Sequence, residues 1–128
     1  MTTLCVVLTS CPPDRADAIA AHLIDGHFAA CVSVVPGAVS TYRWQGQLQR
    51  ETEALLLVKV PQPSLERCLA ALTAVHPYAV PELVVLAAQD VNASYLAWAM
   101  AMTAVEPIAA LSGAKPKRRR GRTTKAPQ

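Results

Sequence analysis

The stretch that decides the fold is HPYAVPELVVLA, which spans His76–Ala87. Pro77 and Pro81 end any preceding helix and push the residues before them toward extended geometry. The apolar run at 83–87 then predicts a strand. The turn between these elements carries three side chains of types that often bind ligands or act as acids and bases, which is unusual for a simple connection. They are His76, Tyr78 and Glu82.

Apolar periodicity outside this turn predicts three more strands and three helices. The expected strands cover 3–9, 28–44 with a bend at Pro36-Gly37, and 48–60. The expected helices cover 13–25, 64–74 with Ser64 as N-cap, and a stretch from Asn92 or Ser94 to about 104. This order predicts an α+β, ferredoxin-like βαββαβ sandwich with an antiparallel sheet and an additional C-terminal helix. The third helix and neighbouring subunits are expected to cover the sheet face that the first two helices leave open.

Composition favours one oligomeric domain followed by a tail. Hydrophobic residues make up 52% of the 128 residues and charged residues only 16%, which indicates that other copies of the chain cover part of the surface. Seven of the twelve basic residues fall at 115–125, so residues 1–114 carry five basic and nine acidic residues. We therefore expect an acidic domain over 1–107 and a basic disordered tail over 108–128. The tail is expected to make at most weak contacts with nucleic acid.

The four cysteines do not form a recognisable metal or disulfide framework, because their spacing fits no zinc-finger pattern and contains no CxxC. No signal peptide or membrane span is expected, which predicts a cytoplasmic, reduced protein without membrane contact. Cys5, Cys31 and Cys68 are expected to be buried as small hydrophobic side chains.

Several separate motifs over residues 3–105 resemble the CutA family of divalent-cation tolerance proteins. The matching residues are Leu8-Thr9, Pro12, Ala29-Ala30-Cys31-Val32, Pro36-Gly37, Ser40, Tyr42, Trp44-Gln45-Gly46, Glu53, Lys59, His76-Pro77-Tyr78, Pro81-Glu82 and Tyr95-Leu96-Ala97-Trp98. The resemblance implies a ferredoxin-like protomer in a tight, PII-like homotrimer with edge strands paired between subunits. It also implies binding of copper or other divalent metal ions, and no established catalytic reaction.

The candidate metal ligands are His76 and Cys11. Imidazole and thiolate suit copper, and the end of the first strand can lie beside the exit of the second helix in this topology. Of the ligands that the resemblance implies, only His76 is carried over, because Val75 and Thr9 stand at the other two places. His76 is also a favourable residue at a helix C-terminus, so a purely structural role remains open.

A second group of polar and aromatic residues is expected near the boundaries between subunits. It comprises Tyr42, Trp44, Glu53, Lys59, Tyr78 and Glu82. These residues either line three equivalent clefts that hold a small ligand or an ion, or form interface pairs in which the aromatic rings pack. The sequence favours neither alternative.

The sequence is compatible with two functions from different classes. One is a trimeric binding protein for copper or another divalent cation, involved in the response to metal ions. The other is a PII-like structural or signalling trimer whose clefts bind a small ligand or a protein partner. An enzyme of the acylphosphatase type is not expected, because Cys11-Pro12-Pro13 leaves few amides to hold a phosphate at the first strand–helix turn.

Overall fold

The structure is a computed structural model that describes residues 2–104. The strands are β1 (Leu4–Cys11), β2 (Cys31–Trp44), β3 (Gln47–Pro61) and β4 (Val84–Ala87). The helices are α1 (Ala16–Asp25), α2 (Leu65–Val75) and α3 (Ala93–Met102), and short 3-10 turns at 13–15 and 62–64 lead into the first two. The predicted basic tail at 108–128 lies outside the described residues.

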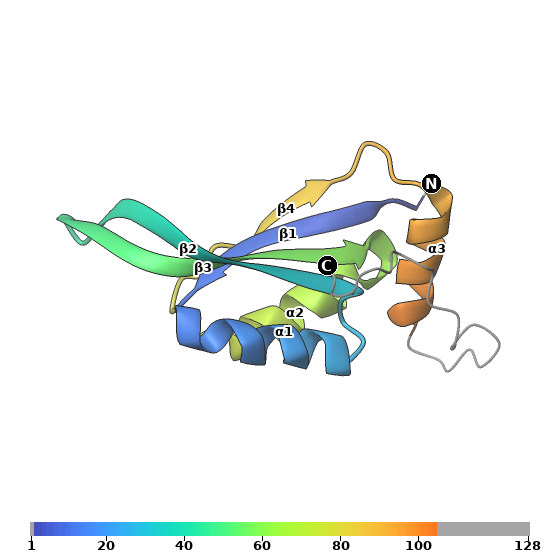
Figure 1. The fold of residues 1–128 in the computed structure, drawn as a ribbon, viewed down its shortest axis with the longest axis horizontal. Coiled ribbons are helices and arrows are strands. Elements are labelled where there is room, and N and C mark those ends of the chain that lie inside the picture. The colour runs from blue at the N-terminus through green and yellow to red at the C-terminus, as the bar shows by residue number, and fades with distance from the viewer. Residues whose placement is uncertain (1, 105–128) are drawn as a thin grey trace.

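The four strands form one antiparallel sheet in the order β2-β3-β1-β4. Helices α1 and α2 lie side by side on one face of this sheet, and the β2–β3 hairpin projects well beyond them (Figure 1). The predicted α+β, ferredoxin-like arrangement is thus confirmed.

Strand periodicity explains where the core sits. Side chains alternate between the two faces of a strand, so Cys5, Val7 and Cys11 of β1 all point toward the helices, and all three are buried. Leu56 and Val58 on β3 meet them on the same face and are fully buried. Burying each such aliphatic side chain contributes about 1.5–3 kcal/mol, which makes this layer the main source of stability.

Helix α3 packs against one end of the sheet rather than across it. A small second core joins Ala99 of α3 to Leu4 and Ala30. Ser64 occupies the predicted N-cap position of α2, but its hydroxyl donates to the Thr103 carbonyl at 3.4 Å. This buried contact ties the start of α2 to the end of α3.

One predicted boundary is wrong. Residues 28–30 were expected to belong to the second strand, which instead begins at Cys31. The amides of Phe28 and Ala29 donate to the Leu23 carbonyl at 2.9 and 3.2 Å, so these residues close the C-terminus of α1. His27 takes a positive φ of 60° to make that turn.

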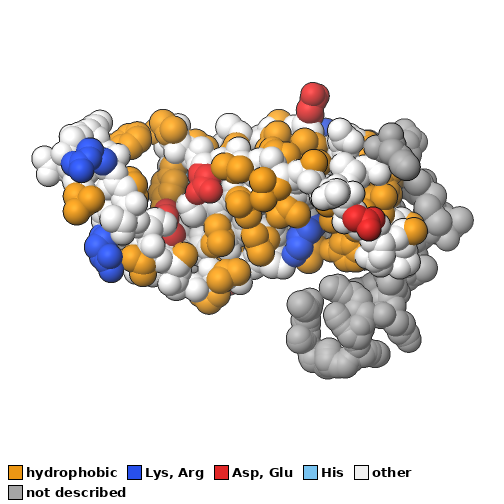
Figure 2. All heavy atoms as spheres, turned by 90° about the horizontal axis from the view of Figure 1, so that it is seen from above, with side chains coloured by type: hydrophobic (Ala, Val, Ile, Leu, Met, Phe, Trp, Pro, Cys, Tyr) orange, Lys and Arg blue, Asp and Glu red, His pale blue; other side chains and the backbone are white. Residues whose placement is uncertain are grey.

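The sheet face opposite α1 and α2 is apolar but largely open. Figure 2 looks onto this face and shows hydrophobic side chains gathered over the middle of the sheet. Val35, Val84 and Leu86 lie among its exposed residues. No helix within residues 2–104 is both long and apolar enough to cross a membrane.

Candidate functional site

A β-bulge in β2 determines which side chains reach the candidate site. The pairing of β2 with β3 shifts between Val35, which faces Leu55, and Ala38, which faces Glu53. Strand β2 therefore carries one extra residue at this point, and Gly37 provides the positive φ of 79°. Beyond the bulge, the even-numbered residues of β2 share a face with the odd-numbered residues of β3.

This register places two aromatic rings and two carboxylates on the same side of the hairpin. Tyr42 and Trp44 of β2 face the same side as Glu51 and Glu53 of β3. That side is the open face of the sheet, because Glu53 is two residues from Leu55, which pairs with Ser10 on the face away from the helices.

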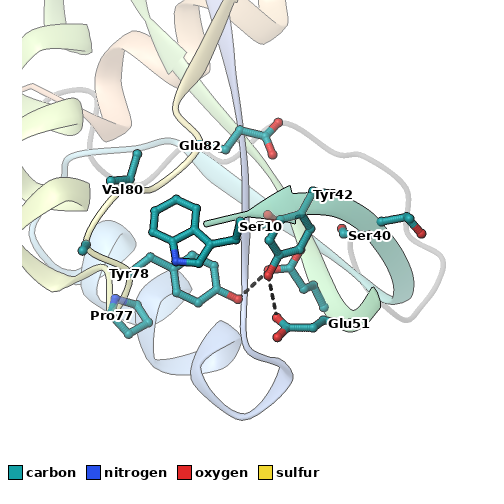
Figure 3. A pocket seen from close by; sticks show the side chains of 12 residues that line it. Ser10, Ser40, Tyr42, Glu51, Pro77, Tyr78, Val80 and Glu82 are labelled. Atoms are coloured by element: carbon teal, nitrogen blue, oxygen red, sulfur yellow. Dashed lines mark hydrogen bonds between the residues drawn. The ribbon is translucent and has the colours of Figure 1, made fainter. Parts of the chain in front are cut away.

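The turn at 77–82 forms the opposite wall of a pocket with a volume of about 730 Å³. Figure 3 shows Pro77, Tyr78 and Val80 on one side of this pocket and Tyr42, Ser40 and Glu51 on the other. The full lining consists of Ser10, Ser40, Thr41, Tyr42, Trp44, Glu51, Glu53, Pro77, Tyr78, Ala79, Val80 and Glu82. The volume falls within the range of small-molecule sites in proteins.

Two tyrosine–glutamate pairs hold the carboxylates in place. The Tyr78 hydroxyl donates to Glu53 Oε2 at 2.5 Å, and the Tyr42 hydroxyl donates to Glu51 Oε1 at 3.0 Å (Figure 3). Only 5% of the surface of Glu53 is exposed, whereas Glu51 is exposed. The hairpin and the 77–82 turn are thereby linked across the pocket.

The same pairs keep both phenols protonated. Burial, followed by the hydrogen bond to Glu53 and its negative charge, raises the pKa of Tyr78. Loss of water around its hydroxyl, together with the hydrogen bond to Glu51, raises the pKa of Tyr42. Both tyrosines therefore act as hydrogen-bond donors to the carboxylates.

The pocket is negatively charged, because its lining includes three carboxylates and, among the described residues, no lysine, arginine or histidine. Five of the six residues predicted for the inter-subunit cleft are brought together here. They are Tyr42, Trp44, Glu53, Tyr78 and Glu82.

Lys59, the sixth predicted cleft residue, lies farther along β3 and does not line this pocket. Its ammonium group donates to Ser33 Oγ at 2.5 Å and lies 3.7 Å from Cys31 Sγ. The structure therefore separates the lysine from Glu53, with which the sequence had grouped it.

His76 is held by two backbone groups. Its Nδ1 accepts from the Tyr78 amide at 3.2 Å, so the ring proton is on Nε2, which donates to the Ser10 carbonyl at 2.9 Å. The ring also lies 5.0 Å from the Tyr78 ring, centroid to centroid. The imidazole thus fixes the 77–82 turn to the end of β1.

Cys11 is the next residue after the one that His76 contacts, but its thiol points into the core beneath the helices. Burial and the charge of Glu53 raise the pKa of Cys11, while Arg15 has a smaller opposite effect. Thr9 faces the same layer, and its hydroxyl is buried without a hydrogen-bond partner in the described part of the chain. Within residues 2–104, no three His, Cys, Asp or Glu side chains converge as a metal-binding group.

The sequence analysis missed Glu51, Ser10 and Val80 as pocket residues. Glu51 had a usable signal, because residues two apart on a strand share a face and Glu51 must therefore accompany Glu53. Ser10 and Val80 come from separate elements that only the tertiary fold brings together.

Comparison with known proteins agrees with this architecture. The sequence matches the CutA1 divalent ion tolerance protein family over residues 5–102. It is 43% identical over 94 residues to the divalent-cation tolerance protein CutA of Thermus thermophilus, an alignment that covers 73% of this chain and 91% of that protein.

Solved structures with the same fold include CutA from Xylella fastidiosa, with a TM-score of 0.77 and 33% identity over 80% of this chain and 99% of that one. The PII-like protein CutA from a Nostoc species aligns with a TM-score of 0.76 and 31% identity, over 80% of this chain and 99% of its own. The fold, the ordered motifs and the extent of the match agree, and the chain belongs to the CutA1 divalent ion tolerance family.

Proposed function

We propose that this chain is a homotrimeric, cytoplasmic cation-binding protein, and that the acidic pocket beside the hairpin is where a divalent cation binds. One observation carries the proposal. In a chain related to divalent-cation tolerance proteins, three glutamates and two phenols line a pocket that contains no cationic side chain within residues 2–104. A binding role rather than a catalytic one also fits the description of the family.

The open sheet face supports the trimer. Leu86, Val84 and Val35 keep between 43% and 50% of their surface exposed in one protomer. Apolar faces of this kind are typical of surfaces that other subunits cover. Because the pocket opens on the same face, assembly would place it near a seam between subunits.

The donor set favours a hard cation. Carboxylate oxygens suit magnesium, manganese and calcium, and a magnesium site often uses one or two carboxylates and keeps several waters. Glu51 and Glu53 provide such a pair, and water or a second subunit would complete the coordination. This explains how a divalent ion could bind without three convergent ligands in one chain.

Copper at His76 and Cys11 is the second candidate. It is favoured by the contact between His76 and Ser10, which places the imidazole next to the residue that precedes Cys11. Binding there requires the imidazole to release Ser10 or the Tyr78 amide, and the thiol to turn out of the core.

Calorimetric titration of the full chain with Mn(II), Zn(II), Cu(II) and Cu(I) tests both candidates. We expect Glu51→Gln and Glu53→Gln each to weaken Mn(II) binding by about tenfold or more, because each removes a charged ligand. Glu66→Gln, on the exposed side of α2, is the matched control and should leave the affinity unchanged.

The copper candidate predicts the opposite pattern. Loss of Cu(I) binding in His76→Ala and Cys11→Ser, with the glutamate variants unaffected, would move the site from the pocket to that pair. Binding of no ion to any variant or to the unmodified chain would contradict the proposed function itself.

A further inference from the structure

We propose that the pocket between the hairpin and the 77–82 turn binds a small organic ammonium cation that carries an apolar body. The inference rests on the proposed function only in placing cation binding at this pocket, and it names a different class of cation. The volume of the pocket, its negative charge and its apolar lining residues each support the proposal.

The pocket is larger than a hydrated metal ion requires. Six waters of about 30 Å³ each give a hydrated divalent ion a volume of roughly 200 Å³. The pocket has a volume of about 730 Å³, which leaves room for a molecule of the size of an aromatic amine.

The charged part of the pocket suits an ammonium group. Glu53 is 5% exposed, and the Tyr78 hydroxyl engages Oε2, one of its two carboxylate oxygens. A buried carboxylate of this kind is stabilised by a positive charge that also donates hydrogen bonds. The rings of Tyr42, Trp44 and Tyr78 line the same space and offer π-faces to the cation.

The opposite wall suits an apolar body. Pro77, Ala79 and Val80 of the turn line the pocket, and Val80 keeps 70% of its surface exposed. Trp44 on the hairpin keeps 48%. A metal ion gains little from covering these side chains, whereas an organic ligand removes their apolar surface from water.

Three probes that differ in one property each test the proposal with the full chain. Phenethylammonium has both the charge and the ring, ethylammonium has only the charge, and 2-phenylethanol has only the ring. By calorimetry, we expect phenethylammonium to bind about tenfold or more tightly than either of the others. Equal affinity for 2-phenylethanol would show that the charge plays no part, and equal affinity for ethylammonium would show that the apolar wall plays none; either result overturns the proposal.

Matched variants locate the site. Glu53→Gln is expected to weaken phenethylammonium binding by about tenfold or more, while Glu66→Gln leaves it unchanged. Because Glu53 is buried, Glu51→Gln, at an exposed position, provides the same test if the first variant does not fold. Unchanged binding in a folded glutamate variant would overturn the assignment.

A separate Mn(II) titration distinguishes this inference from the proposed function. Mn(II) binding without phenethylammonium binding overturns the inference alone, and absence of both overturns both. If the two cations share the glutamates, excess Mn(II) should displace phenethylammonium, and simultaneous binding at full affinity would contradict the shared pocket.

Discussion

On the sheet face that α1 and α2 cover, Val7, Leu56 and Val58 are fully buried, whereas on the opposite face Leu86 keeps 50% and Val35 keeps 43% of its surface. The two faces have similar side chains there, because β1 and residues 54–61 of β3 are apolar at most positions. A strand that faces water on one side normally alternates apolar and polar residues. The nearly continuous apolar pattern is therefore typical of a sheet that is covered on both faces, although the two helices cover only one.

The largest effect on folding should come from the covered face. Leu56→Ala is expected to lower the free energy of unfolding by about 2–5 kcal/mol, because it removes a fully buried side chain and leaves a cavity. Urea denaturation measures this change. Ile24→Ala, at a position on α1 that keeps 39% of its surface exposed, is the control and should cost well under half as much.

The open face should instead control assembly. Leu86→Asp places a carboxylate where the proposed trimer buries an apolar side chain, so we expect the mass by light scattering to fall from three chains to one. Circular dichroism should retain the signal of a folded protomer, because position 86 is exposed in the single chain.

Glu66→Gln, a charge change of the same size on the helix side, should leave the mass unchanged. If Leu86→Asp also keeps the mass of the unmodified protein, the open face is not the assembly surface and the contrast between the two faces needs another explanation.

A smaller effect concerns a thiol in the covered layer. Burial raises the pKa of Cys68 from 9.0 to about 11. Between these values the unfolded chain loses the thiol proton while the folded chain keeps it, so the free energy of unfolding should fall as pH rises from about 9 to about 11. Chemical denaturation at a series of pH values measures this fall. Cys68→Ala should make the decrease of the free energy of unfolding with pH shallower. An unchanged decrease would show that other groups cause it. Cys31→Ala, on the open face, is the comparison variant.

Much of the fold could be predicted from local sequence patterns. Period-two and helical periodicities, with breaks at the prolines, predicted the order of strands and helices along the chain and the cores of α1 and α2. The start of β2 was mispredicted because Phe28 and Ala29 are apolar like a strand, while their amides close the end of α1. Hydrogen bonding of backbone groups at helix ends leaves little trace in side-chain composition.

The candidate site was predictable only in part. Tyr42, Trp44 and Glu53 line one pocket with Tyr78 and Glu82, the residues with which the sequence had grouped them near the boundaries between subunits. The separation of Lys59 from Glu53 was predictable, because both lie on one strand and six residues at about 3.3 Å each place them about 20 Å apart. The contact of His76 with Ser10 depends on the packing of the turn against β1 and has no local signal.

The bulge before Ala38 also determines the charge of the pocket. Val35 and Ala38 both face the open side although they are three residues apart, so a β2 strand of the same length without the bulge would turn every outer side chain to the other face. Arg43 would then replace Tyr42 and Trp44 on the pocket side. The extra residue accommodated by the bulge therefore sets the charge of this wall: with the bulge the wall presents aromatic rings that suit a cation, and a regular strand of the same length would present a guanidinium that attracts anions.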